Sequence, residues 1–154
     1  MPARGVVELQ GGSLRETEIL LDQLNRAFGG EAWHGPALRN LLDGLRVRQA
    51  KAHPIEAGHS ILDLVVHIMT WMDVVARRLG GETVDSGSVP DWTDTSAAAW
   101  RGAIEALENA QSRLCDAVAR LGGEALKSKE SEILGVLQHT VYHAGQIGIL
   151  KKAV

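Results

Sequence analysis

Two histidines in the C-terminal part of the chain have a spacing that suits metal chelation. His139 and His143 are four residues apart in the segment HTVYH. On an α-helix, residues at this spacing differ by about 40° around the axis and by about 6 Å along it, so two imidazoles can face one point. The same pair also occurs by chance on many helices, where it forms a half-buried polar flank. Metal binding by this pair is therefore a hypothesis that needs a third ligand.

His67 is the best candidate for that third ligand. At about 100° per residue, it lies at the edge of the apolar arc formed by Leu64, Val65, Ile68 and Trp71. A partly buried histidine, bonded to a neighbouring helix, explains the same position equally well. If the two histidine-bearing helices are neighbours, three neutral imidazoles can form an open centre of the catalytic type. We predict a divalent ion there, zinc or nickel first, with iron and manganese as alternatives.

The other histidines are weaker candidates. His34 lies beside a tryptophan in a loop, His53 precedes a proline, and His59 precedes a predicted helix cap. We interpret them as solvated loop side chains, although His34 or His59 could line a pocket. Asp63 lies one turn before His67, where it could orient the imidazole, but we favour a capping role. Gln146 follows His143 on the same stripe, where binding of substrate or of a metal-bound water, or else helix packing, would explain it.

Several other kinds of chemistry lack support in the sequence. Thr140 stands where the zinc-protease motif H-E-x-x-H requires glutamate, which disfavours a protease of that class. Neither a glycine-rich phosphate loop nor a G-x-S-x-G elbow occurs. Cys115 has no base partner nearby in sequence, and Trp71 and Trp92 are interpreted as packing residues. No catalytic acid, base or nucleophile is assigned.

The hydrophobic periodicity predicts an all-α protein, a four-helix bundle in a single domain spanning residues 1–154. The long helices are predicted at residues 13–28, 61–79, 96–121 and 131–152, with a short helix at 36–45. Ser13 with Glu16, and Ser60 with Asp63, have the spacing of capping boxes, and Ser131 is the predicted cap of the last helix. Residues 82–95 form a long polar loop that we expect to shape the pocket together with Trp33 and His34.

Composition excludes several function classes. The chain has 154 residues, 45% of them hydrophobic, and a formal net charge of −3 without blocks of like charge. This balance is typical of a globular protein and gives no basic footprint for nucleic acid. No apolar run has the length of a membrane span or a signal peptide. The single cysteine, Cys115, excludes an intrachain disulfide. We therefore expect a cytoplasmic protein that binds neither nucleic acid nor membrane.

Three segments give the chain a resemblance to the DinB-like superfamily, which includes the YfiT-type metal-dependent hydrolases. They are the segments 33–36 (WHGP), 59–68 (HSILDLVVHI) and 139–147 (HTVYHAGQI). The ending H-x-x-x-H-A-G-Q-I is the most specific of them. The resemblance implies a four-helix bundle with a long crossover, frequent homodimerisation, and a metal held by His67, His139 and His143.

The resemblance implies less about the reaction. Relatives include transferases and isomerases that use low-molecular-weight thiols, and members that are classed as hydrolases. The leading hypothesis is an enzyme whose metal activates a thiol or water toward a small electrophilic substrate. The rival hypothesis is a non-catalytic protein, such as a stress-related dimeric scaffold whose metal stabilises the bundle. Sequence alone does not choose between them.

Overall fold

The computed structural model describes residues 5–154, with side chains from residue 15 onward. This part of the chain is all-helical and contains no β-strand, which confirms the predicted fold class. The elements are α1 (Gly5–Gly29), α2 (Leu38–Leu42), α3 (Val47–Ala50), α4 (Ile61–Leu79), the 3-10 turn η1 (Ser86–Ser88), α5 (Trp100–Ala119) and α6 (Gly123–Lys151). Among the described residues, no helix has the length and apolar character needed to cross a membrane.

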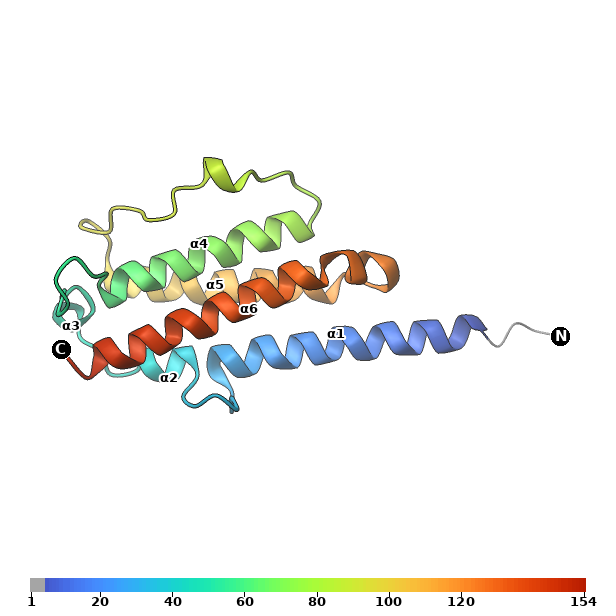
Figure 1. The fold of residues 1–154 in the computed structure, drawn as a ribbon, viewed down its shortest axis with the longest axis horizontal. Coiled ribbons are helices and arrows are strands. Elements are labelled where there is room, and N and C mark those ends of the chain that lie inside the picture. The colour runs from blue at the N-terminus through green and yellow to red at the C-terminus, as the bar shows by residue number, and fades with distance from the viewer. Residues whose placement is uncertain (1–4) are drawn as a thin grey trace.

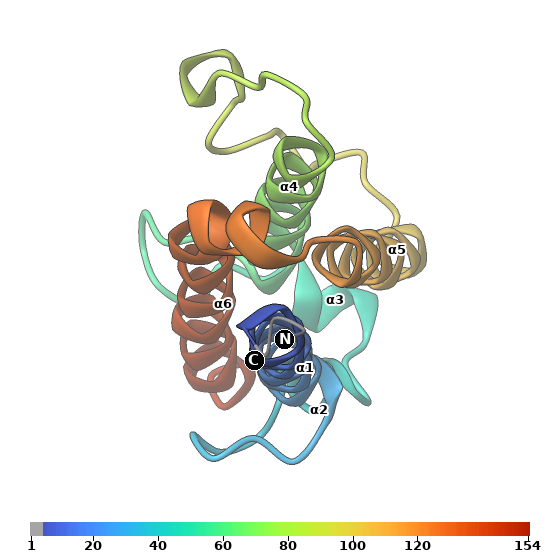
Figure 2. The ribbon, with the colours of Figure 1, turned by 90° about the vertical axis from the view of Figure 1, so that its right-hand side faces the viewer.

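Four long helices, α1, α4, α5 and α6, lie alongside one another, and the short α2 and α3 lie toward one end (Figure 1). In the end-on view, α4 lies next to both α5 and α6, while α1 contacts α5 and α6 from the other side (Figure 2). The helices predicted to carry the three histidines are therefore neighbours, as the metal hypothesis required.

One hydrophobic core joins the long helices. Each contributes buried side chains, for example Leu24 from α1, Ile68 from α4, Leu114 from α5 and Ile147 from α6. Complete burial of an aliphatic side chain of this size stabilises the fold by about 1.5–3 kcal/mol. This packing holds α4 and α6 side by side and so fixes the frame on which the histidines sit.

Residues 80–99, which we call the crossover, join α4 to α5 by returning along the outside of α4 (Figure 1). Because of this return, α4 and α5 run in the same direction. Arg78 fastens the first part of the crossover: its Nη2 donates to the Val84 carbonyl at 2.6 Å and to Ser86 Oγ at 2.7 Å. The predicted polar loop is thus a strap held against α4.

Helix α4 has the predicted bounds, and its capping box is confirmed. The Asp63 amide donates to Ser60 Oγ at 3.1 Å, and the Ser60 amide donates to Asp63 Oδ2 at 2.8 Å. These two bonds satisfy amide groups that have no carbonyl partner within the helix. They set where α4 begins and therefore where His67 lies along it.

The predicted starts of two other helices are wrong. Helix α1 begins at Gly5 rather than at residue 13, because glycines in a helix are unfavourable by only about 1 kcal/mol each. The side chain of Ser13 lies outside the described residues. Helix α6 begins at Gly123, so Ser131 lies inside it and is not a cap. The polar stretch before Ser131 stays helical because Leu126, on the same face as Ile133, is buried.

Smaller differences concern the remaining helices. Helix α5 is shorter than the predicted range 96–121 at both ends, because residues 96–99 belong to the crossover and Arg120 is its C-terminal cap. The short helix predicted at 36–45 is α2, which is limited to Leu38–Leu42. Helix α3 was not predicted, since a single turn gives too few residues for a hydrophobic period to show.

Ser60, which caps α4, and Ser131, which lies inside α6, allow a paired test of the caps. Replacing Ser60 with alanine removes a cap, so we expect the free energy of unfolding to fall by about 0.5–2 kcal/mol. Replacing the exposed Ser131, inside α6, should leave it unchanged or raise it by up to about 0.5 kcal/mol, because alanine has the higher helix propensity. Urea denaturation of both variants measures the difference, and a larger loss for Ser131→Ala would contradict the observed start of α6.

Candidate metal centre

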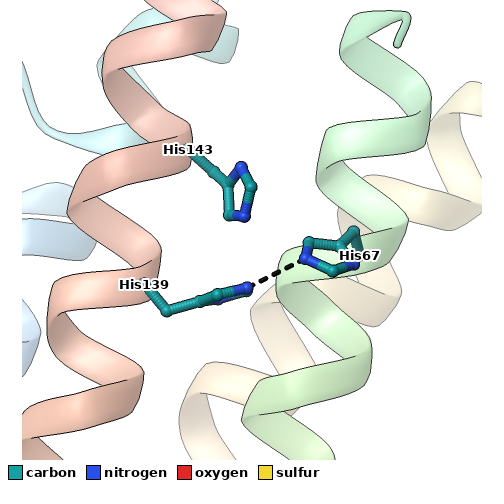
Figure 3. Close-up of side chains that lie close together, drawn as sticks. All are labelled: His67, His139 and His143. Atoms are coloured by element: carbon teal, nitrogen blue, oxygen red, sulfur yellow. Dashed lines mark hydrogen bonds between the residues drawn. The ribbon is translucent and has the colours of Figure 1, made fainter. Parts of the chain in front are cut away.

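Three histidines from neighbouring helices converge on one place. His67 comes from α4, and His139 and His143 come from consecutive turns of α6 (Figure 3). One ring nitrogen from each lies within 4.8 Å of the other two, so the three side chains could hold a metal ion. His67 and His143 are buried, and His139 is partly buried. The structure thus brings together all three residues that the sequence singled out.

The outer nitrogen of His67 is bonded to the crossover. His67 Nδ1 lies 2.6 Å from the main-chain carbonyl oxygen of Asp91. A carbonyl oxygen can only accept a hydrogen bond, so the proton of the neutral ring is on Nδ1. The lone pair is then on Nε2, which faces α6. An outer hydrogen bond of this kind orients a histidine that binds a metal and raises its basicity.

His143 has the same arrangement within α6. Its Nδ1 donates to Oε1 of Gln146 at 2.6 Å, one turn further along the helix. The lone pair of the neutral ring therefore also lies on Nε2. This contact gives Gln146 a role beside the expected ones, which were binding of substrate or of a metal-bound water, and helix packing. Gln146 is an orienting partner of a candidate ligand.

His139 lacks such an outer partner. Its Nε2 lies 2.9 Å from Nε2 of His67, the contact dashed in Figure 3. Its Nδ1 is buried and has no hydrogen-bond partner within residues 5–154. Because His67 Nε2 carries a lone pair, the proton in this contact belongs to His139. In the other neutral tautomer the proton of His139 lies on Nδ1 and its Nε2 also carries a lone pair, so His139 could donate to a metal ion together with His67, and the donor set fits a metal.

The electrostatics of the site favour neutral imidazoles. Burial, together with the neighbouring rings of His143 and His67, lowers the pKa of His139 to about 4. Burial also lowers the pKa of His143, although the hydrogen bond to Gln146 acts in the opposite direction. Only a neutral imidazole can bind a metal, and protons compete with the ion for the same lone pair. The surroundings therefore keep these rings in the form that binds metal near pH 7.

The crossover covers one side of the centre with an aromatic ring. Trp92 stacks on His67 with ring centroids 4.1 Å apart, and His59 stacks on Trp92 at 3.4 Å. Asp91, the residue before Trp92, is held by two hydrogen bonds. Its carbonyl oxygen accepts from His67, and its carboxylate accepts from Trp71 Nε1 at 3.3 Å. The indole of Trp92 thus forms a wall of the site. Of the segments expected to shape the pocket together, loop 82–95 contacts a candidate ligand, whereas Trp33 and His34 do not.

Comparison with protein families agrees with this geometry. A family model of the DinB superfamily matches residues 32–147, a segment that contains all three histidines. The chain belongs to the DinB superfamily. This match confirms the resemblance that the motifs indicated. No curated protein and no solved structure matched the chain.

In this DinB-superfamily protein, Asp63 is a capping residue rather than an orienting partner of His67. Besides the cap, its Oδ1 accepts a hydrogen bond from Thr95 of the crossover, and its Oδ2 lies 3.3 Å from His53 Nε2. Burial by itself raises the pKa of Asp63, but the bonds from Thr95 and Ser60 outweigh it, so the pKa lies below its usual value. One carboxylate thus anchors both the start of α4 and the end of the crossover.

Other residues singled out in the sequence lie apart from the centre. Trp33 and His34 line a cavity of about 640 Å³ between α1 and α6, and none of the three histidines lines it. Cys115 is half-buried on α5, where Gln111 Nε2 donates to its sulfur at 3.3 Å. Burial raises the pKa of its thiol, which disfavours the reactive thiolate.

Sequence reasoning missed two crossover groups of the DinB-superfamily site. Asp91 contributes a main-chain carbonyl, which every residue carries, so no sequence signal marks it. The sequence indicates a packing role for Trp92, and the residue does pack, but against the imidazole of His67. The signal available in the sequence was a tryptophan, next to an aspartate, in a loop of mostly polar residues.

Gln146 can be tested with a matched residue on the same helix. Replacing it with leucine keeps the approximate size but removes the oxygen that accepts from His143, so we expect metal affinity to fall about 10- to 100-fold. Competition titration against a coloured chelator measures this affinity. Gln138 is exposed on α6, and Gln138→Leu should leave the affinity unchanged. Equal losses in the two variants would contradict a specific role for Gln146.

Proposed function

We propose that this chain is a metal-dependent enzyme that activates a thiol or water toward a small electrophilic substrate. The observation that carries the proposal is the convergence of three histidines from α4 and α6. Within the described residues, no cysteine, aspartate or glutamate joins them as a fourth ligand. Three protein ligands are typical of catalytic zinc sites, which leave a position for water or substrate, whereas structural sites use four. Zinc or nickel is the proposed ion, with iron and manganese as alternatives.

The chemistry proposed for the metal is electrostatic. A bound divalent ion lowers the pKa of a thiol or water molecule and so supplies a nucleophile at neutral pH. The chain's own residues orient the candidate ligands and shield the site from water. Asp91 and Gln146 hold two imidazoles with their Nε2 lone pairs facing inward, and the Trp92 indole excludes water from one side.

The partners and cellular location stay predictions. We propose a low-molecular-weight thiol as co-substrate, in keeping with the resemblance to thiol-dependent enzymes of the superfamily. Water as the nucleophile would make the protein a hydrolase instead. A homodimer and a cytoplasmic location complete the proposal, and the single cysteine is compatible with a reducing compartment.

Elemental analysis of the untagged protein tests the metal site directly. We expect about one divalent ion per chain, lost when His67, His139 and His143 are all replaced by alanine. The control is His34→Ala, which removes an exposed histidine outside the cluster and should leave the metal content unchanged. Circular dichroism checks that each variant is folded. Unchanged metal content in the folded triple variant would overturn the proposal.

Turnover measurements then choose the nucleophile. Metal-loaded protein is mixed with a panel of small electrophiles, with and without cellular thiols. Thiol-dependent loss of the electrophile, absent in the triple variant, supports the transferase. Cleavage that does not depend on thiol would replace it with the hydrolase.

Thermal unfolding separates the enzyme from a scaffold whose metal is structural. The hydrophobic core that joins the four long helices extends well beyond the histidines. We therefore expect the protein to remain folded when a chelator removes the metal, with only the stabilisation due to ligand binding lost. Unfolding at room temperature on chelation would favour the non-catalytic alternative, because structural zinc sites supply folding energy outright.

A further inference from the structure

A cavity of about 320 Å³ lies between the segment before α4 and the C-terminal part of α6; none of the three histidines lines it, but two of its lining residues lead to them. Four aliphatic side chains make its lining largely apolar. Leu64 and Leu150 are buried and form its floor, while Ile55 and Ile149 stand at its rim with exposed fractions of 53% and 66%. A cavity of this size, with an aliphatic lining and few polar groups, is typical of small-molecule sites.

Two further residues of the lining connect the cavity to the metal centre. Gln146 lines the cavity and also accepts the hydrogen bond from His143 Nδ1 at 2.6 Å. His59 lines it as well and stacks on Trp92, which in turn stacks on His67. A molecule in the cavity is therefore separated from His143 by the side chain of Gln146, and from His67 by the two stacked rings of His59 and Trp92. Gln146 is thus a wall that the cavity and the centre share.

The charge of the lining limits what the cavity can accept. Among the described residues that line it, none is lysine, arginine, aspartate or glutamate. A neighbouring cavity of the same volume is different, since Lys51, Asp63 and Asp94 all line it. His59 lines both and separates an apolar chamber from a polar one. Moving a charged group from water into the apolar chamber would be costly without a partner charge.

The rim of the cavity is set by a tight turn. The Gly58 amide donates to the Ile55 carbonyl at 3.0 Å, and a Cβ at Gly58 would lie 3.1 Å from the Ile55 Cβ. Ala57, within the turn, has a φ of 57°, in the left-handed region that non-glycine residues rarely adopt. The turn therefore holds Ile55 in place at the rim even though its side chain is half exposed.

We propose that this cavity binds an uncharged, apolar substituent of the electrophilic substrate. The inference rests on the proposed function, because the occupant is part of the molecule attacked at the metal centre. It names the substrate class: a small electrophile with a short alkyl or similar apolar group and no charge on that part. The polar chamber on the other side of His59 takes no part in this recognition.

Linear alcohols test the cavity without any turnover. Propan-1-ol to hexan-1-ol are titrated into the full-length protein, and the methyl signals of Ile55, Leu64, Ile149 and Leu150 are followed by NMR. We expect saturable shifts at these methyls, with affinity rising about fourfold for each added methylene. Hexanoate and hexylammonium should bind at least about tenfold more weakly than hexan-1-ol.

Two isoleucines provide a matched pair of variants. Ile55 at the rim and Ile19 on α1 have the same exposed fraction, 53%, but only Ile55 lines the cavity. Ile55→Asp should weaken hexan-1-ol binding about tenfold or more, and Ile19→Asp should leave it unchanged. Because both side chains are half exposed, neither change buries a charge in the core. Circular dichroism confirms the fold of each variant.

Three outcomes of the binding measurements would overturn the inference, and a change of oligomeric state would be a fourth. The three are shifts that do not saturate, equal binding of the charged analogues, and equal effects of the two variants. A change of oligomeric state specific to Ile55→Asp, measured by sedimentation, would instead make the cavity a contact between copies of this chain, which also overturns it. Alcohol binding does not require the metal. A protein that fails to bind alcohols would therefore contradict the cavity inference without contradicting the proposed metal site. Binding by the triple histidine variant would show that distinction directly.

Discussion

The hydrogen bond from His67 to the Asp91 carbonyl is the contact on which the candidate centre depends. It joins the middle of α4 to the crossover, and it decides which nitrogen of His67 carries the proton. The next residue, Trp92, is thereby placed against the face of the same ring. This one hydrogen bond therefore orients a candidate ligand, holds the crossover against α4 and places Trp92 as a wall of the site.

This contact is possible because of the way in which α4 and α5 are connected. The two helices run in the same direction, so the chain must return along the molecule between them (Figure 1). The end of the crossover is held by a hydrogen bond between Thr95 and Asp63, and its beginning by a hydrogen bond from Arg78 to the Val84 carbonyl. A long polar segment, which would be mobile if it were tethered only at its ends, becomes a fixed surface over the histidines.

Burial explains the electrostatic character of the site. The apolar surroundings penalise a charged imidazole, which lowers the pKa of His139 and His143 and keeps their lone pairs free. The same exclusion of charge continues into the adjoining cavity floored by Leu64 and Leu150. A neutral, low-dielectric environment strengthens the effect of any bound cation on a nucleophile beside it. The neutral imidazoles of the candidate centre and the apolar lining of the cavity both follow from the packing of α4 against α6.

The sequence by itself determined the all-α class, the bounds of α4 and the positions of the three histidines, because helical periodicity and capping are local properties. It misplaced the starts of α1 and α6, where tolerated glycines and the buried Leu126 extend each helix. Only the tertiary structure decided that α4 adjoins α6, that the Asp91 carbonyl orients His67, and that Trp92 covers it. Those contacts join residues far apart in the chain, and a main-chain carbonyl has no signature in the sequence.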